Sequence, residues 1–207
     1  SNRFKKMIYF GSGAEFDKTS AIIDIKEDAF GRSIPKDQYG LGKYVMNLNT
    51  RNSNNIYNLR LFGTINPLER YTKNVISNIC VKAISGDKIS LRKNCMFSFV
   101  DMDDVILLVK RMLREDLCFH DYNITSGKNY SLADIAEIIS KMSAKRNPVI
   151  FENEGLNLEY TGSNERIISQ FTNFQFTDIS VSLKKVYDFY IQNQSAIDFE
   201  NVDSRWK

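Results

Sequence analysis

The feature that most constrains the fold is an apolar run near the N-terminus, residues 7–10 (MIYF), which the sequence Gly-Ser-Gly closes at residues 11–13. An unbroken apolar run is typical of a strand in a parallel sheet that is covered on both faces. We therefore expect a buried strand over residues 5–10 with Ser12 at its C-terminal tip. In α/β proteins, ligands bind outside the carboxyl ends of the strands. The alternative is an ordinary turn, because Gly-Ser-Gly is common in turns.

A helix is expected downstream of this strand, over residues 39–49. Its apolar residues recur at spacings of three and four, namely Leu41, Tyr44, Val45 and Leu48. Tyr39 and Lys43 would share one face of this helix, since they stand at positions i and i+4. A lysine ammonium near a tyrosine hydroxyl favours the phenolate, which could then act as acid or base. A surface Tyr-Lys pair on an amphipathic helix would show the same spacing.

The remaining segments alternate between expected strands and helices. Further strands are expected at residues 56–62, 88–92, 96–100, 121–125 and 148–151. Further helices are expected at residues 75–84, 105–113, 132–142 and 183–191, with Gly86, Asp103-Asp104, Ser131 and Ser182 at their ends. Residues 19–38 are expected to form a loop with a helical turn at 26–28, and residues 155–173 show no clear pattern. This order predicts an α/β protein with a smaller lobe after it.

The composition excludes several classes of protein. The chain has 207 residues and a net charge of +3, which gives no reason to expect a nucleic-acid or anionic-membrane partner. A metal site is not expected, because Cys80, Cys95 and Cys118 are widely spaced and His120 is the only histidine. No apolar run approaches the ~18 residues of a membrane span, and no signal peptide is visible. We therefore expect a cytoplasmic protein with reduced cysteines.

Several segments together resemble one known family. Residues 7–16 look like the strand and serine turn of the extended short-chain dehydrogenase/reductases, the NAD-dependent sugar-nucleotide epimerase/dehydratase family. Residues 35–43 resemble the Tyr-x-x-x-Lys segment of that family. Residues 58–67, 99–105 and 122–132 are similar to its later strands and turns, in the same order. The resemblance covers residues 5 to about 190.

The resemblance implies the C-terminal part of a doubly wound, Rossmann-like parallel sheet plus a small α+β substrate-binding lobe. Residues 1–66 would be the remainder of the Rossmann-like domain, and residues 67–207 mainly the lobe, with elements that return to the sheet. The family's glycine-rich phosphate-binding turn precedes the serine strand, and nothing in this sequence matches it. We therefore expect the N-terminal dinucleotide-binding half to be absent from this chain, leaving an unpaired sheet edge that promotes homo-oligomer formation.

The resemblance also implies roles for individual residues. Ser12, Tyr39 and Lys43 would be catalytic, with Tyr39 as the acid/base and Ser12 bonded to the reacting sugar oxygen. Tyr39, Lys43 and Gly11 would bind the cofactor, while Ser12 and Asn78 would bind the substrate. Arg60 lies within an expected strand, where it could simply pair with a nearby carboxylate.

The implied function is hydride transfer between NAD or NADP and a nucleoside-diphosphate sugar by the full-length protein, as an epimerase, dehydratase or reductase. We expect no bound cofactor and no activity for these 207 residues alone. The alternative is a non-catalytic module that binds a sugar nucleotide, or an inactive fragment. A third interpretation is a self-contained α/β interaction domain in which these motifs occur by chance.

Overall fold

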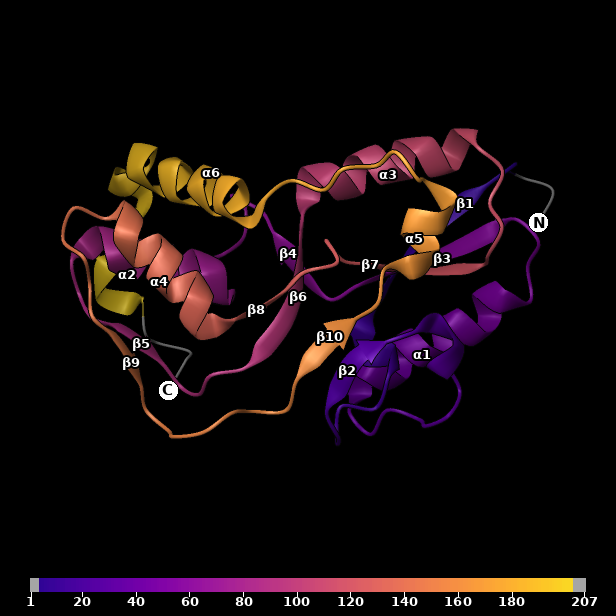
Figure 1. The fold of residues 1–207 in the computed structure, drawn as a ribbon, viewed down its shortest axis with the longest axis horizontal. Coiled ribbons are helices and arrows are strands. Elements are labelled where there is room, and N and C mark those ends of the chain that lie inside the picture. The colour runs from indigo at the N-terminus through magenta and orange to yellow at the C-terminus, as the bar shows by residue number, and fades with distance from the viewer. Residues whose placement is uncertain (1–3, 203–207) are drawn as a thin grey trace. The chain divides into compact units, whose positions relative to one another are not determined.

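The computed structural model describes residues 4–202 (Figure 1). The chain forms two compact units, and each is assembled from segments that are separated in the sequence. The first unit comprises the described residues up to Thr64, with Phe97–Asn129 and Leu158–Phe176. The second comprises Ile65–Met96, Tyr130–Asn157 and the described residues from Thr177 onward. Both units therefore draw on the chain beyond residue 66.

A three-stranded parallel sheet in the first unit carries Ser12. Its strand order is β1 (Met7–Ser12), β3 (Ile56–Leu61) and β7 (Asp121–Ile124). β7 and the centre of β3 are buried, but in β1 only Gly11 and Ser12 are. The expected burial of the whole serine strand is wrong, because β1 lies at the edge of this sheet and leaves Phe10 46% exposed.

Helices cover both faces of this sheet, as a doubly wound fold requires (Figure 1). α1 (Gln38–Arg51) contacts β1 and β3 from one side. α3 (Met102–Arg114) packs against the other side, and α5 (Glu165–Gln170) contacts β7. The core on the α3 side includes Leu59, Val105, Leu108, Met112, Tyr122 and Ile124.

The caps of these helices follow the sequence. α1 begins after Asp37, whose carboxylate accepts a hydrogen bond from the Gly40 amide. Asp101 caps α3, and the expected pair Asp103-Asp104 occupies its first turn. Carboxylates at these positions favour helix formation because they oppose the positive end of the helix dipole.

The first unit also contains strands that were not expected. β2 (Ile22–Ile25) lies in the segment expected to be a loop, and it pairs in parallel with β10 (Tyr160–Gly162), which pairs with β6 (Met96–Asp101). The expected helical turn is present as a short 3-10 helix, Glu27–Ala29. Two more short strands, β4 (Gly63–Ile65) and β8 (Asn129–Ser131), lie where the chain passes from one unit to the other.

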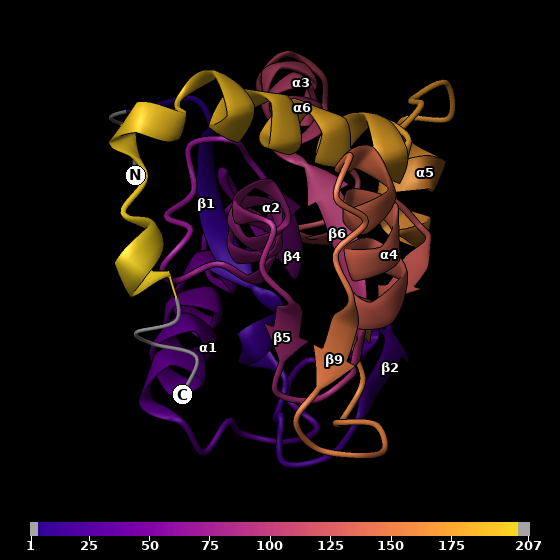
Figure 2. The ribbon, with the colours of Figure 1, turned by 90° about the vertical axis from the view of Figure 1, so that its left-hand side faces the viewer.

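Three helices and a two-stranded sheet make up most of the second unit (Figure 2). α2 (Val75–Ser85), α4 (Leu132–Met142) and α6 (Ile179–Gln192) pack against one another, and β5 (Ile89–Leu91) pairs in parallel with β9 (Val149–Phe151).

Two of the expected caps in the second unit are confirmed and one is wrong. Gly86 ends α2 in the left-handed conformation, with φ of 93°. Ser131 and Asp134 form a capping box at α4. Ser182 lies inside α6, because the Asp178 carboxylate caps the helix one turn earlier.

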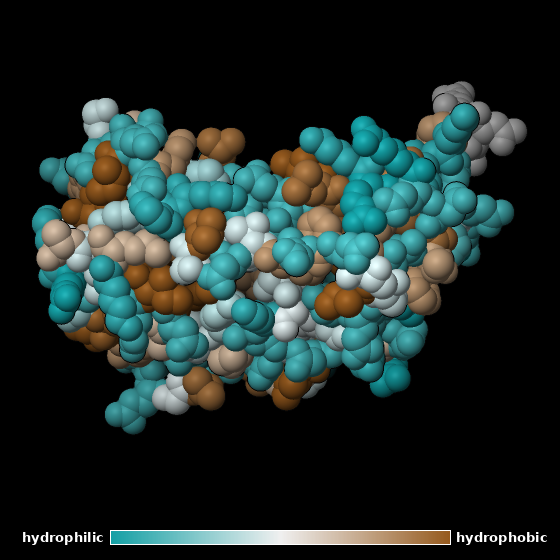
Figure 3. Space-filling view, turned by 45° about the horizontal axis from the view of Figure 1, so that its top comes forward, coloured by the Kyte–Doolittle hydropathy of each residue, from teal (hydrophilic) through white to brown (hydrophobic). Residues whose placement is uncertain are grey.

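The described residues show neither a membrane span nor a metal cluster. Of the helices within residues 4–202, none combines the length and apolar character needed to cross a bilayer. Those residues also contain no group of three or more histidine, cysteine, aspartate or glutamate side chains arranged to hold a metal ion. On the face shown in Figure 3, apolar side chains form separate groups among hydrophilic ones.

Candidate functional site

Ser12 is the last residue of β1, and it also starts the turn that follows. The Ser12 hydroxyl accepts a hydrogen bond from the Ala14 amide at 3.2 Å and caps the 3-10 helix Gly13–Glu15. The Ser12 amide donates in return to Oε1 of Glu15, also at 3.2 Å. This reciprocal pair forms a capping box that fixes the backbone of Ser12.

The first turn of α1 lies directly against the serine turn. A Cβ atom on Gly40 would stand 2.5 Å from the backbone oxygen of Ala14, so only glycine permits this approach. Asp37 holds the same turn by accepting from the Gly40 amide at 2.9 Å, and it pairs with Lys18 at 3.3 Å. The beginning of α1 is therefore seated on the end of β1.

Lys43 connects the predicted tyrosine to the serine strand. Its ammonium donates to the backbone oxygen of Phe10 at 2.8 Å, two residues before Ser12. The same ammonium lies 5.9 Å from the centre of the Tyr39 ring and 5.2 Å from that of Tyr9. Tyr39 is 59% exposed, so a ligand can reach it.

Gly11 faces a buried polar cluster. A Cβ atom on Gly11 would lie 2.1 Å from Oδ1 of Asn58 and 2.2 Å from Oε1 of Glu15. Glycine is required here so that these side chains can approach the backbone of β1. Its role toward a cofactor stays a prediction.

Tyr160 is a candidate site residue that sequence reasoning missed. It forms a hydrogen bond with the Ser12 side chain and packs against the rings of Phe62 and Phe97, with ring centres 5.1 and 6.0 Å away. Burial raises the pKa of the Tyr160 phenol far above its usual value, and the Ser12 hydrogen bond offsets this only in part. The available signal was the pair Tyr160-Thr161, whose aromatic and β-branched side chains suit a strand.

A buried ion-pair cluster lies behind the site. Arg60 is fully buried, and its guanidinium contacts Glu15 and Asp121 at 2.6 Å each, which confirms the expected carboxylate partner. Asp121 also binds Arg51 and Arg166, both at 2.7 Å. Burial acts to raise the pKa of Asp121, but the guanidinium groups of Arg60 and Arg51 outweigh it and hold this pKa below its usual range.

One row of side chains on α1 connects the exposed and buried parts of the site. Tyr39, Lys43, Asn47 and Arg51 follow one another at i+4 spacing. The Asn47 amide donates to Oε2 of Glu15 at 2.8 Å, and Arg51 reaches Asp121. Extending the Tyr-Lys spacing by two further steps would have indicated both residues from the sequence.

Asn78, the other predicted substrate contact, belongs to α2 in the second unit. It is buried, and its side-chain nitrogen donates to the backbone oxygens of Tyr71 and Val202 at 3.1 and 3.0 Å. Those two bonds use both of its N–H donors. Binding of a substrate by Asn78 stays a prediction.

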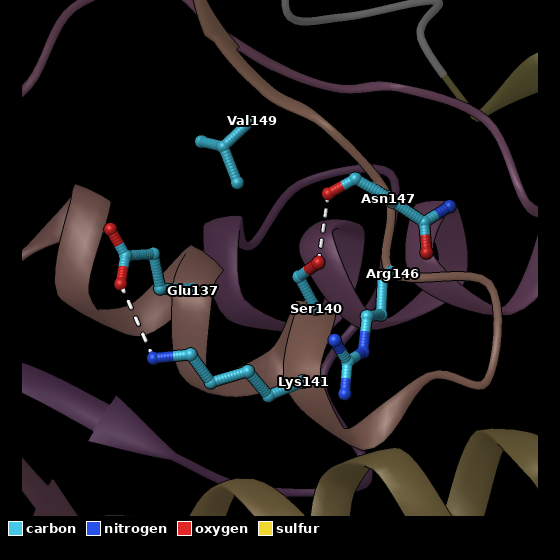
Figure 4. A pocket seen from close by; sticks show the side chains of 6 residues that line it. All are labelled: Glu137, Ser140, Lys141, Arg146, Asn147 and Val149. Carbon is cyan, nitrogen blue, oxygen red and sulfur yellow. Dashed lines mark hydrogen bonds and ion pairs between the residues drawn. The ribbon is translucent and has the colours of Figure 1, made fainter.

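The second unit also contains a pocket of about 550 Å³ (Figure 4). It is lined by Glu137, Ser140, Lys141, Arg146, Asn147 and Val149. Glu137 pairs with Lys141 at 3.4 Å, and the Ser140 hydroxyl donates to the backbone oxygen of Asn147 at 2.8 Å. The Asn147 amide donates to backbone oxygens of Lys82 and Asp87. The polar groups of this lining thus bind largely to the protein itself.

Comparison with known proteins shows which solved structures share the fold of this chain. No family model matches the sequence, and no curated protein matches it. Among solved structures, the GDP-L-fucose synthetase from Naegleria fowleri bound to NADP has a TM-score of 0.81 at 14% identity, covering 92% of this chain and 65% of that one.

Two further solved structures match in the same way. The Bordetella bronchiseptica enzyme WbmG in complex with NAD and UDP has a TM-score of 0.75 at 17% identity, covering 91% of this chain and 59% of that one. The UDP-glucuronic acid 4-epimerase from Bacillus cereus in complex with NAD has a TM-score of 0.74 at 18% identity, covering 92% and 63%. The chain thus spans 59% to 65% of the length of these three structures and has their fold over that part.

Proposed function

We propose that this chain supplies the catalytic side chains of an NAD(P)-dependent enzyme that epimerises, dehydrates or reduces a nucleoside-diphosphate sugar. The observation that carries the proposal is the position of Lys43, whose ammonium donates to the backbone oxygen of Phe10 in the serine strand and lies 5.9 Å from the centre of the Tyr39 ring. The structures of similar fold support it, since they are an epimerase bound to NAD, a synthetase bound to NADP, and an enzyme bound to NAD and UDP.

The hydroxyl of Ser12 would donate to a substrate oxygen. A serine hydroxyl has one donor and two acceptor positions. Ser12 accepts from the Ala14 amide and shares a hydrogen bond with the Tyr160 phenol. A sugar hydroxyl or keto oxygen beside Ser12 would take the Ser12 proton, and the protonated Tyr160 phenol would then donate to Ser12 in return.

Tyr39 would move the proton that accompanies hydride transfer. Its exposed phenol would accept a proton from a sugar hydroxyl or return one to a keto oxygen. The Lys43 ammonium would stabilise the phenolate, and its hydrogen bond to Phe10 holds it close to Tyr39. A nicotinamide cofactor, when bound, would exchange the hydride.

The residues beside β1 would contact only the nicotinamide end of a dinucleotide cofactor. Tyr39 and Lys43 lie beside β1, which has a strand neighbour on one side only within residues 4–202. A dinucleotide also needs a glycine-rich strand-turn-helix unit for its pyrophosphate. We propose that such a unit lies against the open edge of β1 in the working enzyme.

We also propose that the protein forms a homo-oligomer. α1 presents Leu41, Val45 and Leu48 at helical spacing, and each is between 42% and 46% exposed. An apolar stripe of this kind on a helix is stabilised by a second apolar surface. Sedimentation at micromolar concentration is expected to show a dimer or larger species, and a monomer would contradict this proposal.

A second candidate function is a module that binds a sugar nucleotide without turnover. The chain spans 59% to 65% of the length of the structures that it matches, so turnover by the whole protein stays a proposal. The two candidates share a substrate class and differ in chemistry.

Calorimetry and turnover assays separate these candidates. We expect the chain to bind UDP-glucose, and the full-length protein to convert a nucleoside-diphosphate sugar with NAD or NADP in a reaction that Ser12→Ala abolishes. Binding without turnover in the full-length protein would favour the module. Tight NAD binding by this chain alone would contradict the need for a further pyrophosphate unit. Binding of neither ligand by the full-length protein would overturn both candidates.

A further inference from the structure

Glu15 joins the serine turn to the elements around it. It is 1% exposed, and its Oε1 accepts from the Ser12 amide at 3.2 Å. Its Oε2 accepts from Asn47 on α1 at 2.8 Å and from Nε of Arg60 on β3 at 2.6 Å. Asn58, also on β3, donates to both oxygens at 3.0 Å. One carboxylate thus contacts the serine turn, α1 and β3.

Only an ionised carboxylate suits this position. A carboxylate has about four lone-pair sites, and every partner of Glu15 is a donor. A proton on either oxygen would face another N–H group. The balancing charge comes from Arg60, which is buried with the rings of Phe16 and Phe30 each 5.1 Å from its guanidinium.

The partners of Glu15 are the neighbours of the proposed catalytic residues. The Ser12 amide belongs to the residue whose hydroxyl would bind the substrate. Asn47 lies one helical turn after Lys43 and two turns after Tyr39. Lys43 and Gly40 also contact the serine strand and its turn, but Asn47 provides the fully buried connection.

We propose that Glu15 is a positioning residue, which fixes Ser12 at one distance and angle from the helix face that carries Tyr39 and Lys43. The effect of Glu15 on catalysis rests on the proposed function. Its effect on the position of Ser12 does not. Asp121 provides the comparison, because it binds the same Arg60 but has its other ion pairs with Arg51 and Arg166 and not, within residues 4–202, with the serine turn.

The test compares Glu15→Gln with Asp121→Asn. Both variants remove one negative charge from Arg60. A glutamine oxygen can keep the bonds to Asn47 and Arg60 only if its NH₂ group faces the Ser12 amide, which then loses its acceptor. We expect hydrogen exchange of the Ser12 amide, measured by NMR on the intact chain, to be about tenfold faster in Glu15→Gln than in Asp121→Asn. Equal rates in the two variants would overturn the proposal.

Turnover by the full-length protein, with UDP-glucose and NAD as probes, supplies the second readout. We expect Glu15→Gln to lower kcat by about 100-fold while KM changes little, because a small misplacement of Ser12 affects chemistry more than binding. Asp121→Asn is expected to keep kcat. If the wild type turns over no nucleoside-diphosphate sugar but Ser12 exchange still accelerates only in Glu15→Gln, the proposed function fails and Glu15 remains the positioning residue.

A second variant covers the case in which Glu15→Gln does not fold. Asn47→Ala removes the helix side of the connection and one acceptor of the Thr50 hydroxyl within α1. Asn49→Ala is its control, because Asn49 is exposed and its side chain donates to the oxygen of Val45 in the same helix. The Ser12 amide resonance is expected to move in Asn47→Ala and not in Asn49→Ala. An unmoved Ser12 resonance in Asn47→Ala would overturn the proposal.

Discussion

Helix α1 contains two glycines, and the structure predicts opposite effects when each is replaced by alanine. A Cβ atom on Gly42 would have no atom within 4 Å. Alanine stabilises a helix interior over glycine by about 0.8–1.0 kcal/mol, so Gly42→Ala is expected to raise the free energy of unfolding by about that amount.

Gly40 differs because a Cβ atom there would lie 2.5 Å from the oxygen of Ala14 and 2.9 Å from Oδ2 of Asp37. Ordinary contact begins at 3.4 Å, so α1 and the serine turn must separate by about 0.9 Å. Overpacking of this kind costs about 1–3 kcal/mol. The gain in helix propensity is similar in the two variants, so their difference in unfolding free energy mainly measures the crowding around Gly40.

Urea unfolding followed by far-ultraviolet circular dichroism is the assay. Gly42→Ala should unfold at a higher urea concentration than the wild type, and Gly40→Ala should be about 1–3 kcal/mol less stable than Gly42→Ala. In the full-length protein, Gly40→Ala should also lower turnover by about 100-fold, because the separation of α1 from the serine turn moves Tyr39 relative to Ser12. Equal stability of the two variants would show that the helix does not rest on the serine turn.

Three further predictions concern other contacts. Asp121→Asn should lower the free energy of unfolding, measured in urea, by about 3 kcal/mol at pH 7. Because the pKa of Asp121 is depressed in the folded state, the difference from the wild type should be full above about pH 4 and shrink as the pH falls further. A difference that stays constant down to about pH 3 would contradict this. Tyr160→Phe should lower the unfolding free energy by about 1 kcal/mol through the lost hydrogen bond to Ser12, and unchanged stability would contradict that bond. Gly86→Ala should lower the melting temperature more than Gly155→Ala does. Both glycines have positive φ, but of the two only Gly86 also has a side chain within 4 Å of the added Cβ atom. Equal losses of melting temperature would contradict this.

The sequence predicted best the elements whose signals are local. The periodicity of α1 and the capping box at Ser131 depend on residues within a few positions of one another, and the structure has both. β2 and β10 could not be predicted in this way, because each is short and pairs with a strand far away in the sequence. The prediction that Ser182 caps α6 was wrong, because Asp178, one turn earlier, accepts from the Ser180 amide at the start of this helix.

The candidate site was predictable only in the segments that resemble a known pattern. Ser12, Tyr39 and Lys43 belong to segments with a recognisable pattern, and the structure brings Lys43 to Tyr39 and to the serine strand. Glu15 was not singled out from the sequence, because its partners on α1 and β3 are apparent only after the chain folds. A buried charge is stabilised by partners from other elements, which spacing along one segment does not reveal.

The central claim is that Tyr39 is the acid/base of a nucleotide-sugar enzyme. The most direct measurement is kcat of the full-length protein with NAD and a nucleoside-diphosphate sugar, for Tyr39→Phe and for Tyr9→Phe. Tyr9 is the matched control, since its ring also lies beside the Lys43 ammonium. We predict that Tyr39→Phe lowers kcat by at least about 100-fold, while Tyr9→Phe keeps turnover close to that of the wild type. Unchanged turnover in Tyr39→Phe would contradict the claim.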